Sequence, residues 1–251
     1  MIAMHDFAGR VALVTGGAGA IGQAITAALR ERGAQVIAAD RSRSPARPGG
    51  DAVEPLDVTD RGAVAALVHR IEQERGRLDI LVNAAGVVSF GTAAELDEAE
   101  WNRVLDVNLK GSFLACQAVI GPMRRRHYGR IVNLGSVVGK NGGNARPWLD
   151  PAEQQLAGNV AYGVSKAGVH VMTAFLAREL AASGITVNAV APGPIATGMT
   201  ASFPAALRAA IPAGRMGTVA DVSRAVLFLA ADEAGFVSGE ILDVNGAMWC
   251  D

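Results

Sequence analysis

Short apolar runs alternate along this chain with longer segments in which apolar residues recur at helical spacing. Most of the short runs are continuously apolar, which is typical of parallel strands covered on both faces of a sheet. The pattern predicts seven such strands, at residues 10–16, 34–40, 52–58, 78–86, 129–136, 185–193 and 240–246. Helices are predicted between them, most clearly at residues 21–32, 60–75 and 160–182. The alternation therefore predicts an α/β fold, a doubly wound parallel sheet with helices on both faces.

We expect one domain spanning residues 1–251, because no repeat or low-complexity tract interrupts the alternation. The turn-rich stretches at 41–50 and 140–159 are expected to be excursions from that domain and not linkers between two. A chain of 251 residues, half of them hydrophobic, readily buries a sizeable core.

Charge and cysteine content exclude several classes of protein. The formal net charge is −1, which gives no electrostatic footprint for nucleic acid, and the basic run at 123–127 is interpreted as a solvated helix end. Cys116 and Cys250 lie far apart and suggest neither a disulfide framework nor a metal site. The first ten residues lack the core of a signal peptide, and no apolar run is long enough to span a bilayer. We therefore expect a cytoplasmic protein with no membrane or nucleic-acid partner.

A glycine-rich turn, TGGAGAIG, joins the first predicted strand to the first predicted helix at residues 15–22. Glycines in such a turn allow close approach of a pyrophosphate, which the start of the helix then attracts. Asp40 ends the second strand, where a carboxylate can accept hydrogen bonds from an adenosine ribose. The alternative is a tight turn whose glycines serve only helix–strand packing. The placement of the turn in a strand–helix–strand unit favours a dinucleotide site.

Tyr162 and Lys166 lie four residues apart in a segment that reads as helix, so they share one helical face. Such a pair is usually no more than two neighbours on an amphipathic helix. A free phenol has a pKa of about 10, and a nearby ammonium favours its ionised form. The pair is a candidate for proton transfer if other polar groups converge on it.

Seven motifs point to one family. They are TGGAGAIG (15–22), LDV (56–58), NAAG (83–86), NLKG (108–111), IVNLGS (131–136), YGVSK (162–166) and APGPIAT (191–197). On these motifs, which occur in the family's order, the chain resembles the short-chain dehydrogenase/reductase family over nearly its whole length. The resemblance implies the single-domain Rossmann form of the doubly wound fold. One position departs from the usual pattern, since Ala20 stands where most members carry glycine, and an alanine still fits the start of a helix.

The resemblance implies an acid/base mechanism built on Asn108, Ser136, Tyr162 and Lys166. Tyr162 matches the tyrosine that exchanges a proton with an alcohol or carbonyl oxygen. Lys166 matches the lysine that helps to lower the phenol pKa and binds the nicotinamide ribose. Ser136 matches the serine that hydrogen-bonds the reacting oxygen, and Asn108 matches the asparagine that holds a water behind the lysine. Taken singly, Ser136 could equally cap a turn and Asn108 could mark a local bend in a helix.

The resemblance also implies a nicotinamide cofactor, with hydride passing directly between it and the substrate carbon. Asn83 and Gly86 are expected to shape the backbone beside the cofactor and not to react. NAD is expected over NADP, because the Asp40 carboxylate would meet a 2′-phosphate and residues 16–22 include no basic residue, although Arg41 could reverse this preference. The predicted cofactor-binding residues are Gly16, Gly19, Ala20, Ile21, Gly22, Asp40, Arg41, Asp57, Val58, Asn83, Ala84, Gly86, Tyr162, Lys166, Pro192, Gly193, Ile195 and Thr197.

We interpret the chain as an NAD(H)-dependent oxidoreductase that interconverts a secondary alcohol and a ketone. The resemblance also suggests an alternative, an NADPH-dependent 3-oxoacyl-acyl-carrier-protein reductase. Such reductases usually carry a basic residue in the glycine turn and often another before the GITVN strand, where this chain has residues 17–19 (GAG) and Ser183. The non-enzyme alternative is a nucleotide-sensing or scaffolding protein on the same fold, and the complete catalytic set argues against it.

The segment 140–159 is expected to contribute to the substrate site. Ser136 and Tyr162 are 26 residues apart, a longer interval than is usual in the family, and both ends of the segment adjoin a reacting residue. Trp148 and Val138 are the candidate substrate contacts. The alternative is a surface excursion that packs on a neighbouring subunit.

The partner expected for the active site is a small-molecule alcohol or ketone. A second substrate loop is predicted at residues 194–215, after a Pro-Gly turn. The family is commonly tetrameric, so the resemblance implies a homotetramer that pairs the long helices predicted at 98–118 and 160–182.

Overall fold

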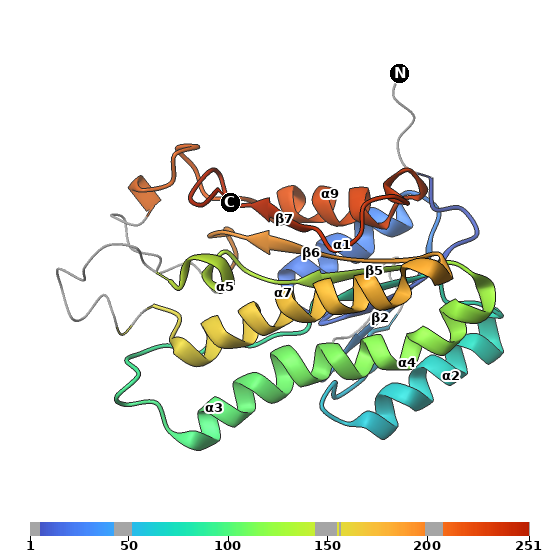
Figure 1. Cartoon of the computed structure of the whole chain (residues 1–251), viewed down its shortest axis with the longest axis horizontal. Coiled ribbons are helices and arrows are strands. Elements are labelled where there is room, and N and C mark those ends of the chain that lie inside the picture. The colour runs from blue at the N-terminus through green and yellow to red at the C-terminus, as the bar shows by residue number, and fades with distance from the viewer. Residues whose placement is uncertain (1–5, 43–51, 144–154, 156, 199–207, 251) are drawn as a thin grey trace.

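A seven-stranded parallel sheet forms the centre of the structure, a computed structural model that describes residues 6–42, 52–143, 155, 157–198 and 208–250 (Figure 1). The strand order is β3-β2-β1-β4-β5-β6-β7, and every neighbouring pair is parallel. The strands are β1 (Val11–Thr15), β2 (Gln35–Asp40), β3 (Glu54–Pro55), β4 (Ile80–Asn83), β5 (Gly129–Leu134), β6 (Ile185–Pro192) and β7 (Ile241–Val244). The doubly wound fold predicted from the alternation is confirmed.

Helices cover both faces of this sheet, with α1 and α9 on one side and α2, α4 and α7 on the other (Figure 1). The α-helices are α1 (Ala20–Arg30), α2 (Arg61–Arg75), α3 (Glu98–Leu105), α4 (Gly111–Arg126), α5 (Val138–Asn141), α7 (Val160–Leu180) and α9 (Val219–Ala230). A π-helical turn, η1 (Asp106–Lys110), joins α3 to α4, and two 3₁₀ turns follow α7 and α9 as η2 (Ala181–Ser183) and η4 (Asp232–Ala234).

Of the seven predicted strands, the one at 52–58 agrees least with the structure, because only Glu54 and Pro55 pair with β2. Pro55 has no amide hydrogen to donate, which confines it to an edge strand. Beyond it, the Asp57 carboxylate accepts hydrogen bonds from the backbone N–H and the hydroxyl of Thr59 at 2.9 and 2.7 Å. This turn ends the strand early and directs the chain into α2.

The helix predicted at 98–118 continues to Arg126 and changes its hydrogen-bonding pattern on the way. Gly121 and Pro122 weaken helical propensity, but Val119 and Met123 are fully buried in the core and hold the last turns in place. The π-helical turn at Asp106–Lys110 inserts one wide turn at Asn108. The local irregularity at Asn108 is therefore a π-helical turn within a continuous helical segment.

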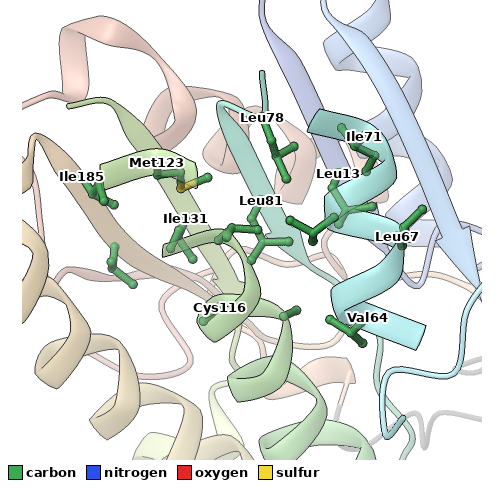
Figure 2. Close-up of a cluster of buried hydrophobic side chains, with 14 of the residues drawn as sticks. Leu13, Val64, Leu67, Ile71, Leu78, Leu81, Cys116, Met123, Ile131 and Ile185 are labelled. Atoms are coloured by element: carbon green, nitrogen blue, oxygen red, sulfur yellow. The ribbon is translucent and has the colours of Figure 1, made fainter. Parts of the chain in front are cut away.

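Two apolar cores hold the helices to the sheet. Figure 2 shows one of them, in which Leu13 and Leu81 of the central strands pack against Leu67 and Ile71 of α2 and the end of α4. The other core lies between the sheet and helices α1 and α9. Each fully buried side chain of this kind contributes about 1.5–3 kcal/mol relative to exposure. These cores fix the ends of the strands, from which the functional residues extend.

One helix of the described residues is long and apolar enough, by composition, to cross a membrane: the segment Val160–Ser183, which contains α7. The fold explains part of this apolar character, because Val169, Leu176 and Leu180 are buried in the protein. We therefore describe α7 as a core helix.

Candidate active site and cofactor site

The carboxyl ends of all seven strands lie at one edge of the sheet because the strands are parallel. The chain runs outward from β1 through β2 to β3 on one side and from β4 to β7 on the other. In open α/β sheets, ligands bind outside the carboxyl ends at such a reversal of strand order. The residues predicted from the motifs lie in the segments that follow these strand ends.

The glycine turn follows β1 and leads directly into α1. Gly16 has a φ of +68°, and a Cβ added there would lie 2.6 Å from the backbone of Ala84 and Ala85. The turn is closed by hydrogen bonds from Gly17 N to Ala39 O and from Gly19 N to Gly16 O. Only glycine at position 16 therefore lets the β1 turn approach the segment after β4 this closely.

The start of α1 suits an anionic group. Helix α1 begins at Ala20 after Gly19, no side chain caps it, and its first turn carries no acidic residue. The first backbone N–H groups of a helix without such caps attract a phosphate. A Cβ on Gly22 would lie 2.2 Å from Gly16 O, so this cradle depends on a second glycine inside the first turn. Ala20 and Ile21 are the first two residues of α1. The uncapped helix start and the two glycines fit the pyrophosphate of a dinucleotide.

Asp40 ends β2 with its carboxylate turned toward the glycine turn. It accepts hydrogen bonds from Ala18 N at 3.1 Å and from Ser42 N at 2.9 Å. Arg41 follows, and its charge is near enough to lower the pKa of Asp57, although the hydrogen bonds from Thr59 lower that pKa more. These three charged residues gather at one end of the cofactor site.

Asn83 and Val58 point into the protein. The Asn83 amide donates to Asn133 Oδ1 at 2.9 Å and to Cys116 Sγ at 3.3 Å, and the side chain is almost fully buried. Val58 packs against Gly111, where a Cβ would lie 2.7 Å from it. Both side chains therefore pack within the protein, and the cofactor roles suggested for Asn83 and Val58 from the sequence stay predictions.

Ser136, Tyr162 and Lys166 converge beyond the end of β5. The Ser136 side chain is near enough to the Tyr162 phenol to lower the pKa of that phenol. Lys166 Nζ donates to Leu134 O at 2.7 Å and lies 5.8 Å from the centroid of the Tyr162 ring. The structure therefore brings together a phenol, a hydroxyl and an ammonium that are up to 30 residues apart in the sequence.

The protonation states at this cluster differ from the sequence-based expectation. Burial raises the pKa of Tyr162 above its ordinary value of 10, and the hydrogen bond with Ser136 opposes this only in part. Burial also lowers the pKa of Lys166 to about 8. The expected lowering of the phenol pKa by the ammonium is therefore not found in the protein alone, and the Tyr162 phenol is neutral at pH 7.

Asn108 lies in the π-helical turn, and its side chain is completely buried. Its Oδ1 accepts from Val87 N at 2.8 Å, and its Nδ2 donates to Val87 O and Ser165 Oγ at 2.9 Å each. The amide thus links the segment after β4 to α7, next to Lys166. Both amide hydrogens are used in these bonds, and the water expected behind Lys166 stays a prediction.

Gly86 lies between these groups. A Cβ on it would be 3.3 Å from Asn108 Oδ1 and 3.5 Å from Lys166 Nζ. Ala84, two residues earlier, forms the other side of the close contact with Gly16. These two small residues let the segment after β4 pass between the glycine turn and the catalytic cluster.

The segment that follows β6 also lies at the carboxyl ends of the strands. Pro192 O accepts from Val137 N at 2.9 Å, and Gly193 N donates to Val244 O at 3.1 Å. Ile195 is buried and forms an isolated parallel bridge with Gly217. Thr197 follows in the described part, whereas residues 199–207 of the predicted substrate loop lie outside the described residues.

The predicted substrate contacts are only partly described. Val138 begins α5 two residues after Ser136, and its N–H donates to Ser136 Oγ at 3.2 Å. Trp148 lies outside the described residues, as do most of residues 144–156. The end of the segment contacts the chain after β4, where Phe90 forms an antiparallel bridge with Gly158 and Asn159 N donates to Ser89 O.

Asn159 and Ser165 contribute to the site and were not predicted from the sequence. Asn159 caps α7 by accepting a hydrogen bond from Tyr162 N at 3.3 Å, and its amide donates to Ser89 Oγ at 2.8 Å. It thereby fixes the first turn of the helix that carries the phenol. The signal for Asn159 was available, because asparagine is a common N-cap and this one stands directly before the helix predicted at 160–182. Ser165, in contrast, matters only because its hydroxyl accepts a hydrogen bond from the Asn108 amide, and that contact could not be predicted from the sequence.

Among the residues that the structure describes, the buried cysteine and the possible metal ligands do not form a second site. Cys116 is buried, and burial raises the pKa of its thiol to about 12, which makes it a poor nucleophile. Within the part of the chain that is described, no three His, Cys, Asp or Glu side chains are grouped so that they could hold a metal ion.

Comparisons with known proteins agree with this arrangement. A family model described as enoyl-(acyl carrier protein) reductase matches residues 16–248. The 3-oxoacyl-[acyl-carrier-protein] reductase FabG of Escherichia coli (strain K12) is 39% identical over 97% of this chain and 99% of its own length. The protein of the same name from Thermotoga maritima is 38% identical over 96% of this chain and 98% of its own length. A solved structure, titled "Crystal structure of gox2181", is 35% identical with a TM-score of 0.85 and covers 97% of this chain and 96% of its own.

Proposed function

Because the chain belongs to the short-chain dehydrogenase/reductase family, we propose that it reduces the ketone of a 3-oxoacyl thioester to a secondary alcohol. Membership of the family makes it an NAD(P)-dependent oxidoreductase that acts on CH–OH donors. The observation that supports the finer assignment is its identity of 39% to a 3-oxoacyl-[acyl-carrier-protein] reductase over nearly the whole of both chains. This proposal takes the substrate class of the alternative from the sequence in place of the broader alcohol dehydrogenase interpretation, and the cofactor is considered separately below.

A protonated Tyr162 phenol is the form that reduction requires. Reduction of a ketone needs a proton donor at the carbonyl oxygen, and burial keeps the phenol protonated. A reduced nicotinamide supplies the hydride when it is bound. Ser136 would donate a second hydrogen bond to the same oxygen and stabilise the negative charge that develops on it. Lys166, which is held by Leu134 O, provides the nearby positive charge that favours the phenolate left after proton transfer.

A substrate panel tests this proposal directly. Purified protein is assayed with acetoacetyl-CoA and with simple secondary alcohols and ketones, each with NADH or NADPH for reduction and NAD or NADP for oxidation. We expect kcat/KM for the 3-oxoacyl thioester to exceed that for every simple ketone. A preference for a simple alcohol or ketone over the thioester would contradict the proposal.

An NAD-dependent dehydrogenase of a secondary alcohol that is not an acyl thioester is the second candidate. An acidic carrier protein needs a basic surface near the active site, yet Ser183 stands where several such reductases carry a basic residue. The one basic run ends α4 next to the amino end of β5, at the edge of the sheet opposite to the catalytic cluster. Two of its arginines pair with carboxylates, Arg124 with Glu179 and Arg125 with Glu72. The same substrate panel separates the two candidates.

We also propose NAD as the preferred cofactor, because the Asp40 carboxylate occupies the end of β2 beside the glycine turn. The substitution Asp40→Asn keeps the shape and an oxygen that can accept from Ala18 N, and removes only the charge. We expect it to raise the ratio of kcat/KM with NADP(H) to that with NAD(H) by about 10- to 100-fold, which corresponds to about 1–3 kcal/mol of relieved repulsion.

The measurement is a comparison of specificity constants for both cofactors in the wild type and the Asp40→Asn variant. A wild type that already prefers NADP(H), with no change on substitution, would show that Arg41 binds the 2′-phosphate and that Asp40 does not discriminate.

We infer that the protein is a cytoplasmic homotetramer, with copies pairing through an exposed apolar face of α7 and the α3–α4 helix. Val164, Val171 and Phe175 lie along this face of α7 and are 42%, 59% and 73% exposed. A hollow beside them is lined by Leu105, Asp106, Leu109, Lys110, Phe113 and Met172. Contiguous exposed apolar surface of this kind marks an interaction site, and a second copy buries it symmetrically.

Introducing a charge on this face should dissociate the assembly. We expect Phe175→Glu to lower the mass measured by light scattering to that of a smaller assembly or monomer, because a carboxylate would be buried at the interface. His69→Glu, on the exposed side of α2, is the matched control and should leave the mass unchanged. A wild-type protein that is monomeric, or a Phe175→Glu variant of unchanged mass, would contradict this assignment.

A further inference from the structure

Helix α7 presents three polar side chains to the end of β5, and the third belongs to His170. Tyr162, Lys166 and His170 are spaced at intervals of four residues, so they lie on one helical face. Tyr162 contacts the Ser136 hydroxyl and Lys166 contacts Leu134 O. His170 Nε2 accepts a hydrogen bond from the backbone N–H of Ser136 at 3.4 Å.

The backbone around Ser136 approaches the imidazole very closely. A Cβ added to Gly135 would lie 2.1 Å from His170 Nε2, and one added to Gly139 would lie 3.0 Å from His170 Cε1. Two glycines that flank the serine therefore leave the space that the ring occupies. A contact this close, made from both sides of Ser136, fixes the distance between the serine segment and α7.

The hydrogen-bonding pattern of the sheet explains why Ser136 needs this partner. The N–H groups of Gly135 and Val137 donate to Val190 O and Pro192 O of β6. Alternate residues of a strand direct their N–H groups to opposite neighbours, so the N–H of Ser136 points away from β6 and toward the β4 side. Strand β4 ends at Asn83, which pairs with Asn133, so β4 does not reach as far as Ser136.

We propose that His170 is a positioning residue for the catalytic serine, and that it takes the place of the missing β4 partner by accepting the Ser136 N–H. This assignment rests on the proposed catalytic role of Ser136. The bond requires an unprotonated Nε2, which in the neutral ring places the proton on Nδ1. With its amide held, Ser136 keeps its hydroxyl directed at Tyr162 and at the reacting oxygen.

Two substitutions separate the acceptor from the bulk of the ring. His170→Gln can place an amide oxygen near the position of Nε2, whereas His170→Leu fills much of the same space and has no acceptor. We expect His170→Leu to lower kcat by about 10-fold, the effect of losing one hydrogen bond that aligns a reacting group. His170→Gln should retain kcat to within about 3-fold, a smaller loss than one typical hydrogen bond. The dissociation constant of the nicotinamide cofactor should stay unchanged in both variants.

A double-mutant cycle with Ser136→Ala decides whether His170 acts through the serine. In the Ser136→Ala background, His170→Leu should change kcat by less than about 2-fold, because the group that it positions has been removed. The same 10-fold loss in that background, or equal losses for the leucine and glutamine variants, would overturn the proposal. Full turnover of the single Ser136→Ala variant would instead refute the catalytic role of Ser136. The cycle therefore distinguishes failure of that role from failure of the His170 proposal alone. Thermal unfolding of each variant confirms that the measured protein is folded.

Discussion

Replacing Tyr162 with phenylalanine is expected to lower kcat by about 10²–10⁴-fold, the usual contribution of a positioned acid or base. The substitution removes the hydroxyl that donates the proton and leaves the ring in place. Cofactor binding should persist, because Lys166 and the glycine turn are unaltered. The measurement is steady-state reduction of the preferred ketone, with cofactor affinity determined separately by fluorescence titration.

Tyr128 provides the matched control, because it is the second of the two tyrosines in the chain. It lies at the opposite edge of the sheet, with the guanidinium groups of Arg10 and Arg130 at 3.9 and 4.5 Å from its ring centroid. Its hydroxyl donates to Asp232 Oδ1 at 2.6 Å. Tyr128→Phe should lower stability by about 1 kcal/mol, one net hydrogen bond, and leave turnover intact. A folded Tyr162→Phe variant that turns over within a few-fold of wild type would remove Tyr162 from the mechanism.

Replacing Lys166 with methionine should have opposite effects on activity and stability. Activity should fall by about 10²-fold or more, because the charge that favours the phenolate is lost. Stability at pH 7 should rise, because the buried ammonium has its pKa lowered from 10.5 to about 8. A shift of this size corresponds to about 3 kcal/mol against the charged form, and the lost hydrogen bond to Leu134 O offsets part of the gain.

The gain in stability should depend on pH in a defined direction. Below pH 8 the lysine is protonated in both the folded and the unfolded protein, so the full cost of the buried charge is present. Between pH 8 and 10.5 the unfolded state binds more protons, and the wild type becomes more stable relative to the variant. Urea unfolding at several pH values measures the difference in the free energy of unfolding. A difference that stays constant from pH 7 to 10.5 would show that Lys166 keeps an unperturbed pKa.

The amino-acid sequence by itself determined the architecture of this protein. Continuously apolar strands alternating with helices can satisfy their burial only as a parallel sheet covered on both faces, and that is the sheet observed. The same periodicity placed Tyr162 and Lys166 on one face of α7, because helical spacing is a local property. The strand predicted at 52–58 is shorter in the structure than the apolar pattern indicates. It ends at Pro55 because the Asp57 carboxylate accepts two hydrogen bonds from Thr59 and closes a turn there.

Only the tertiary structure decided how the reacting groups behave. The pKa values of Tyr162 and Lys166 move away from the direction expected of an isolated pair, because burial is a property of the packed protein and not of the spacing between two residues. The partners of Asn108 come from the segment after β4 and from α7, which the π-helical turn brings together. The contact of His170 with Ser136 depends on where β4 ends relative to β5. Such contacts join residues that are distant in the chain. They depend on the register of the strands and the packing of the helices, and a local sequence pattern does not predict either.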